Sequence, residues 1–239
     1  LIYAFKTMGD RTVIEQDPIN ELNKLYVALS KKIETEPELH EKGKAEFKKL
    51  EDGDTENREL WRWFIDLSLT DFEHYRNELG ILPFDYNLGE SFYEQQLPTV
   101  LAEFTRKGIV KIGETGEKYV DLEEFGLGRC ILIKSDDAST YHMRDCATYI
   151  YRRHEFNFAR NIYIVDNRQA HHFKQLFKVL ELAGYPANAD SIHVDFGFMS
   201  LPDGAISTRK GTTVSLDALL REATSRSLQI INEKNPDLA

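Results

Sequence analysis

The residues with the clearest capacity for chemistry lie in a short polar segment, residues 202–213, which contains two hydroxyls and then two cations: Ser207, Thr208, Arg209 and Lys210. An apolar run over 192–201 precedes it, and a helix-like pattern over 215–231 follows it. A loop between a strand and a helix often holds phosphate, because glycine lets backbone N–H groups turn inward and the helix presents its positive end. Arg209 and Lys210 would neutralise phosphate oxygens. The alternative is a solvated loop with stray cations, and the Walker pattern is absent.

Tyr141 and Asp145 are a second candidate pair. They are four residues apart and share one face if a helix has begun by then, with the hydroxyl at 139 or 140 as a possible cap. A carboxylate beside a phenol suits a cation of fixed shape, and guanidinium fits best because its parallel N–H donors match a carboxylate bidentately. The alternative is that Asp145 pairs with Arg144 or Arg152, or offsets the positive end of the helix.

Gln169 and His172 are three residues apart at the start of another predicted helix, with Asp166 as a candidate N-cap. The glutamine could add an amide acceptor to a substrate site, and the histidine could stack on a nucleotide or hydrogen-bond to it. Taken alone, His172 fits better as an interfacial histidine with satisfied hydrogen bonds.

A β/α alternation from residue 130 onward would position these side chains. The expected strands cover 130–134, 161–165 and 192–199, and the expected helices between them cover 141–153 and 168–183. This order predicts a parallel sheet with right-handed crossovers. Ligands of such sheets lie beyond the carboxyl ends of the strands, so the three candidate groups are expected at one edge.

The region before residue 129 has a different pattern. Residues 15–80 show apolar residues at helical spacing, which predicts amphipathic helices separated by a polar turn at 51–54. Beyond Gly80 we expect three short strands and one helix: strands over 84–86, 109–112 and 118–121, and a helix over 97–107.

Composition restricts the class of protein. The 239 residues are 41% hydrophobic and 29% charged, as in an ordinary soluble protein, and the net charge is −10. Residues 1–125 hold 16 basic and 27 acidic residues, so any RNA contact must be local, and neither DNA binding nor membrane association is expected. The two cysteines give no disulfide or metal pattern, which favours a reducing cytoplasm. The first residue, Leu1, suggests a piece of a longer protein.

Four ordered blocks resemble the second half of the catalytic domain of arginyl-tRNA synthetases, a class I family. They are Tyr141–Asp145, Gln169–Phe177, His193–Gly197 and Ile206–Gly211. The blocks are specific together and not singly, and the resemblance extends over essentially the whole chain. It implies a Rossmann-like fold with three parts: 1–14 as the end of the first Rossmann half, 15–128 as a helical and mixed insertion, and 129–239 as the second half.

The resemblance implies roles for individual residues. Tyr141, Asp145 and Gln169 match the positions that hold the arginine guanidinium, and His172 matches a position near the nucleotide. Residues around the adenine and the triphosphate correspond to Phe196, Gly197, Phe198, Met199, Ser207 and Thr208. Arg209 and Lys210 match the KMSKS-type loop as its catalytic cations. That loop departs from the family pattern, because Ala205 stands where the first Lys would be and Arg209 stands for the second.

The implied activity is ATP-dependent formation of arginyl-adenylate and transfer of arginine to tRNA(Arg), with Mg²⁺ accompanying ATP. In this family the HIGH signature lies upstream of the position of Leu1, so the isolated chain is expected to be inactive. One alternative is a non-catalytic synthetase-like module that binds tRNA or a protein. Another is a different class I synthetase or a related nucleotidyltransferase with the same sheet.

Overall fold

A computed structural model describes residues 1–197, 200–201, 204–205 and 215–235. The chain divides into two compact units, Leu1–Phe84 with Met199–Ala239, and Asp85–Phe198. The domain boundaries expected after residues 14 and 128 remain predictions. Several side chains with predicted roles lie outside the described residues: Phe198, Met199, Ser207, Thr208, Arg209 and Lys210.

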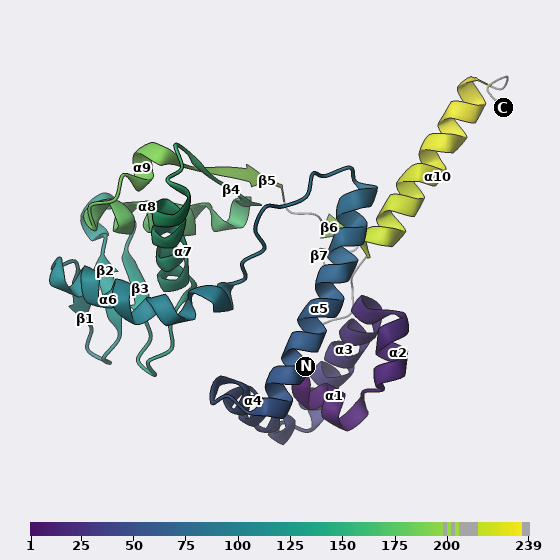
Figure 1. Ribbon diagram of the computed structural model, residues 1–239, viewed down its shortest axis with the longest axis horizontal. Helices are drawn as coiled ribbons and strands as arrows, with labels where there is room; N and C mark the ends of the chain where they lie inside the picture. The colour runs from purple at the N-terminus through teal and green to yellow at the C-terminus, as the bar shows by residue number, and fades with distance from the viewer. Residues whose placement is uncertain (198–199, 202–203, 206–214, 236–239) are drawn as a thin grey trace. The chain divides into compact units, whose positions relative to one another are not determined.

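Helices build the first unit, as the pattern over residues 15–80 predicts (Figure 1). Its first five helices are α1 (Ile2–Met8), α2 (Arg11–Gln16), α3 (Pro18–Thr35), α4 (Glu38–Glu51) and α5 (Thr55–Glu78). The strands β6 (Ser200–Leu201) and β7 (Gly204–Ala205) pair antiparallel, and α10 (Leu216–Lys234) follows them.

Local signals set the helix ends of this unit. The Asp10 carboxylate accepts hydrogen bonds from the backbone N–H groups of Thr12 and Val13, and Pro18 occupies the first turn of α3, where no N–H is needed. One apolar cluster joins four helices through Ile2, Ile14, Leu22 and Phe64. The helical period of the sequence therefore correctly identifies Leu22 and Phe64 as part of a buried face. Tyr26 and Phe72, which have the same helical spacing, are exposed instead.

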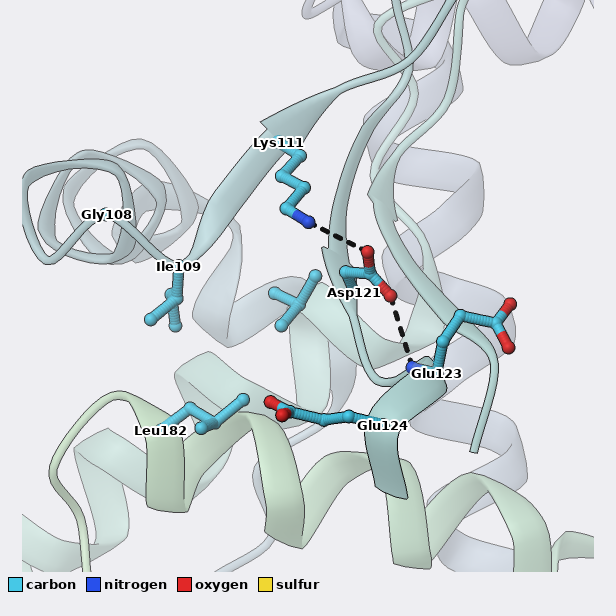
Figure 2. Close-up of a pocket in the computed structure, with 8 residues that line it drawn as sticks. Gly108, Ile109, Lys111, Asp121, Glu123, Glu124 and Leu182 are labelled. Atoms are coloured by element: carbon cyan, nitrogen blue, oxygen red, sulfur yellow. Dashed lines mark hydrogen bonds and ion pairs between the residues drawn. The ribbon is translucent and has the colours of Figure 1, made fainter. Parts of the chain in front are cut away.

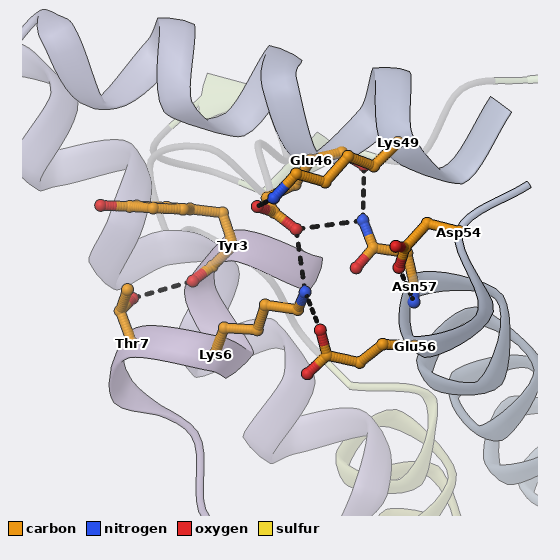
Figure 3. Close-up of polar contacts among 8 residues, drawn as sticks. All are labelled: Tyr3, Lys6, Thr7, Glu46, Lys49, Asp54, Glu56 and Asn57. Carbon is orange, nitrogen blue, oxygen red and sulfur yellow. Dashed lines mark hydrogen bonds and ion pairs between the residues drawn. The ribbon is translucent and has the colours of Figure 1, made fainter. Parts of the chain in front are cut away.

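A polar cluster ties α1, α4 and α5 together (Figure 3). The ammonium of Lys6 lies between the carboxylates of Glu46, at 3.0 Å, and Glu56, at 2.6 Å. The amide of Asn57, a fully buried residue, donates to the backbone oxygen of Glu46 at 2.7 Å and to its carboxylate at 3.0 Å. Hydrogen bonds from Lys49 and Lys6 outweigh burial and lower the pKa of Glu46 to about 2.

Glu46 should make the stability of the chain depend on pH in the acid range. Its carboxylate is ionised in the folded state down to about pH 2, whereas in the unfolded chain it binds a proton near the ordinary glutamate pKa of 4.5. The stabilisation is therefore present above about pH 4.5 and is lost as the pH falls towards 2. We expect Glu46→Gln to remove about 2 kcal/mol at pH 7 and to flatten the pH dependence of urea unfolding. Glu41→Gln on the same helix is the control, because Glu41 is largely exposed, and an equal effect of both variants would contradict the assignment.

The second unit combines helices with two sheets. Its helical segments are η1 (Glu90–Gln96), α6 (Leu97–Arg106), η2 (Glu123–Phe125), α7 (Tyr141–Phe156), η3 (Asn167–Gln169), α8 (Ala170–Leu182) and α9 (Ala187–Asp190). Its strands are β1 (Val110–Ile112), β2 (Lys118–Asp121), β3 (Arg129–Ile133), β4 (Asn161–Asp166) and β5 (Ser191–Phe196). The strand expected over 84–86 is wrong, because these residues lie in an irregular segment.

Strand pairing confirms one part of the sequence-based sheet and corrects another. β4 and β5 run parallel in register, from Asn161 opposite Ser191 to Asp166 opposite Phe196, with α8 in the connection between them. The strand predicted over 130–134 exists as β3, but it pairs antiparallel with β2. The connection from β2 to β3 is short and ends on Gly128 at φ +69°, so it favours pairing between neighbours in the chain over a distant parallel strand.

The parallel pair has one buried and one exposed face. Tyr163 points inward and contacts the rings of Phe173 and Phe177 on α8, with ring centroids 4.9 and 5.7 Å away. The alternate positions face outward and are apolar: Ile162, Ile164, Ile192 and Val194. Strands that are apolar on both faces are typical of sheets with helices on both sides. The parallel pair therefore has an exposed apolar face of the kind that helices cover in such sheets.

Candidate functional site

The predicted site starts at the first turn of α7. The Thr140 hydroxyl accepts a hydrogen bond from the backbone N–H of Met143, so the helix begins at Tyr141, and Asp145 lies one turn further on the same face. The Tyr141 residue is 70% exposed, and the Asp145 side chain is 35% exposed. The helix thus places both groups as the spacing predicts, with the carboxylate partly sheltered and the phenol open to solvent.

Asp145 has a partner that the sequence did not assign to it. Its Oδ2 atom lies 2.6 Å from Nε2 of His172 on α8. A carboxylate only accepts hydrogen bonds, so Nε2 of His172 carries the proton. The two arginines considered as alternatives are placed elsewhere: Arg144 pairs with Glu90 at 3.0 Å, and the guanidinium of Arg152 lies over the Tyr163 ring at 6.0 Å. The contact between Asp145 and His172 joins α7 to α8.

His142 stands behind this pair. Its ring lies 4.1 Å from the His172 ring, centroid to centroid, at 37°. Burial, followed by repulsion from His172, lowers the pKa of His142 to about 4, against the opposing effect of Asp145. His142 is therefore uncharged near neutral pH. His142 was not among the site residues expected from the sequence, although it lies three residues before Asp145 and therefore on an adjacent face of the helix.

Gln175 fixes α8 relative to the antiparallel sheet. Its buried amide donates to the backbone oxygens of Leu127, at 2.7 Å, and Arg129, at 3.3 Å. The sequence signal for this anchor is a polar residue inside the apolar stripe that includes Phe173 and Leu176. Because Gln175 lies almost one turn beyond His172, its two hydrogen bonds also set the position of the His172 ring.

The remaining predicted residues lie at the carboxyl ends of the parallel strands. Gln169 ends the short η3 segment after β4, which the Asp166 carboxylate caps by accepting from the backbone N–H of Arg168. Gln169 is exposed, and within the described residues neither Gln169 nor Tyr141 makes a hydrogen bond to Asp145. Phe196 ends β5 with its ring exposed, and Gly197 follows it. The structure brings together Asp145 and His172, and does not itself assemble the three-residue guanidinium pocket.

A cavity in the described part of the chain lies elsewhere in the second unit. It has a volume of about 480 Å³, and Ile109, Val120 and Leu182 are among its lining residues (Figure 2). Its polar lining consists of three acidic side chains and Lys111, which pairs with Asp121 at 2.8 Å. None of the predicted site residues lines it. An acidic cavity with one engaged cation would repel a triphosphate, so this cavity is not the predicted nucleotide site.

Parallel strands connected through a helix, with polar side chains beyond their carboxyl ends, place the second unit among Rossmann-like α/β domains. A family model described as "tRNA synthetases class I (R), catalytic domain" matches residues 1–239. The chain therefore belongs to this family of class I tRNA synthetases. The match confirms the family resemblance carried by the four sequence blocks.

The chain is similar to arginine–tRNA ligases along its whole length. It is 43% identical over 238 residues to the enzyme of Clostridium botulinum and 44% identical to that of Streptococcus uberis. Each alignment covers 100% of this chain and 42% of the relative, so the chain spans less than half the length of these relatives. The solved arginyl-tRNA synthetase of Plasmodium falciparum matches with a TM-score of 0.66 and 26% identity, over 84% of this chain and 34% of that one.

None of the helices that the structure describes has the length and apolar character to cross a membrane. Cys130 and Cys146 are free and buried. Burial raises the pKa of Cys130 to about 12, so this thiol is not a nucleophile near neutral pH. Within the described residues, no three His, Cys, Asp or Glu side chains are grouped to hold a metal ion.

Proposed function

We propose that the protein to which this chain belongs is an arginine–tRNA ligase, which activates L-arginine with ATP and transfers it to tRNA(Arg). The observation that carries the proposal is the partly sheltered Asp145 carboxylate, fixed between α7 and α8 in a chain similar to arginine–tRNA ligases throughout. A carboxylate accepts two parallel N–H donors from a guanidinium, whereas the ammonium of lysine offers only a point charge. Tyr141 and Gln169 are proposed to complete the pocket from the neighbouring helix turn and strand end.

Adenylate formation requires no covalent intermediate with the protein. An oxygen of the arginine carboxylate attacks the α-phosphate of ATP, the bond to the β-phosphate bridging oxygen breaks, and pyrophosphate leaves. A hydroxyl of the terminal tRNA ribose then attacks the carbonyl carbon, and AMP leaves. Catalysis of the first step rests on positioning and on charge stabilisation at the departing pyrophosphate. Mg²⁺ would reach the site already bound to the triphosphate of ATP, as part of the substrate.

The nucleotide would lie beyond the ends of β4 and β5. We propose that Phe196 to Met199 border the adenine, that Ser207 and Thr208 contact the phosphates, and that Arg209 and Lys210 neutralise the leaving pyrophosphate. The pairing of β5 with β4 supports the proposed adenine site. Phe196, the last residue of β5, lies opposite Asp166, the last residue of β4, at the edge where such sheets bind ligands. The proposed closeness of His172 to the nucleotide follows from the same edge.

The proposal is tested by pyrophosphate exchange into ATP in the full-length protein, with and without tRNA. Exchange should require L-arginine, and both lysine and citrulline should fail to replace it. Citrulline is the sharper comparison, because it keeps the shape of arginine but lacks the charge. Tight tRNA binding without arginine-dependent exchange would instead establish the non-catalytic module, and exchange driven by another amino acid would establish a different synthetase.

The two cations at 209 and 210 should act mainly on the rate of activation. Arg209→Ala is expected to lower kcat for exchange by about thirtyfold, since a charged hydrogen bond to a phosphate contributes about 2 kcal/mol. The KM for arginine should change little, because the guanidinium pocket is formed by other residues. Arg226→Ala on α10, where the arginine is exposed and paired with Glu222, is the matched control. Unchanged exchange in Arg209→Ala would contradict the role of the loop.

A further inference from the structure

We propose that His172 is a positioning residue for Asp145 and holds the carboxylate in the orientation that receives arginine. The Nε2–H group of His172 donates one hydrogen bond, which turns the carboxylate towards the substrate. This inference rests on the proposed function, because it assumes that Asp145 receives the guanidinium.

The geometry leaves room for both partners. A carboxylate has about four acceptor positions on its two oxygens, and the bond from Nε2 of His172 at 2.6 Å uses one of them on Oδ2. The Oδ1 atom and the second lone pair of Oδ2 are then available for the two parallel donors of a guanidinium. A carboxylate held at one oxygen loses less side-chain freedom when the substrate binds, which favours affinity.

The His172 ring is itself held in place. It packs edge-on against the Phe173 ring at 5.3 Å, with an angle of 87°, and lies against the His142 ring at 4.1 Å. Phe173 is in turn stacked on His193 of β5 at 4.4 Å. The hydrogen bonds of Gln175 fix the helix that carries the ring. The side chain of His172 is only 16% exposed, so the contact with Asp145 is not a loose surface pair.

The test measures KM and kcat for arginine in pyrophosphate exchange by the full-length protein, at saturating ATP and pH 8.0. His172→Ala removes the donor and should raise the KM for arginine about tenfold with little change in kcat, because the substrate then has to order the carboxylate when it binds. His172→Gln keeps an N–H donor at this position and should restore most of the wild-type KM.

Two controls separate this inference from the proposed function. His154→Gln removes an exposed histidine of α7 and should keep the wild-type KM for arginine. If Asp145→Asn leaves the KM for arginine unchanged, the guanidinium pocket itself is wrong. If Asp145→Asn weakens arginine binding but His172→Ala keeps the wild-type KM, the pocket stands and the role of His172 is overturned.

A second readout does not depend on activity. Imidazole ¹⁵N resonances of the full-length protein should show His172 with its proton on Nε2 at pH 8, and Asp145→Asn should change the ¹⁵N shift of this nitrogen. A His172 signal that Asp145→Asn leaves unchanged would show that the contact is absent in solution and would overturn the inference.

Discussion

Asp145→Asn in the full-length protein is expected to lower kcat/KM for arginine by about thirty- to several-thousand-fold. The substitution leaves an amide whose NH₂ group faces the guanidinium donors, and losses of this kind cost about 2–5 kcal/mol. The effect should fall on arginine and spare the KM for ATP, because the carboxylate is proposed to contact the guanidinium and not the phosphates. Initial rates of pyrophosphate exchange at varied arginine and varied ATP separate the two substrates.

Asp85→Asn supplies the matched control, since it makes the same change of charge at an exposed position of the same unit. The variant at 145 should also narrow the preference for arginine over citrulline, because the neutral pocket no longer favours a cation. An arginine dependence identical to that of the wild type would remove the central support for the proposed amino-acid substrate.

Asp190→Ala should destabilise the second unit by about 3 kcal/mol, which is a large part of the 5–15 kcal/mol typical of whole domains. The Asp190 side chain is only 9% exposed and accepts hydrogen bonds from three groups. Tyr149 donates to it at 2.9 Å, Arg153 at 2.7 Å and Ser191 at 2.9 Å. Removing the carboxylate leaves the arginine without its counter-charge and the buried phenol without an acceptor.

Urea unfolding measures the loss of stability in Asp190→Ala, and Tyr149→Phe shows how much one hydrogen bond contributes. That variant removes one hydrogen bond and leaves the ion pair with Arg153 intact, so it should cost about 1 kcal/mol. Burial and the carboxylate of Asp190 together raise the pKa of Tyr149, so the phenol stays protonated and continues to donate throughout the neutral range. Equal losses in Asp190→Ala and Tyr149→Phe would mean that Arg153 does not depend on its partner.

How the pocket residues meet could be predicted only in part. The spacing of Tyr141 and Asp145 correctly placed them one turn apart, because the Thr140 cap and the helical repeat are local properties of the chain. The partner of Asp145 could not be read from the sequence. His172 lies 27 residues away, and its ring reaches the carboxylate because α8, which Gln175 ties to the backbone oxygen of Leu127, packs beside α7. Arg144, which is adjacent in sequence, turns instead to Glu90.

The sequence by itself determined the helical first unit, the order of strands and helices after residue 130, the start of α7 at Tyr141 and the family. Each of these depends on short-range periodicity, capping residues and the order of motifs. These signals can be identified without knowing which distant segments are in contact. Tertiary structure alone decided that β3 joins the antiparallel sheet, that His142 and His172 stack, and that Asp190 collects three donors. These outcomes depend on which surfaces bury one another, and burial is a property of the packed chain.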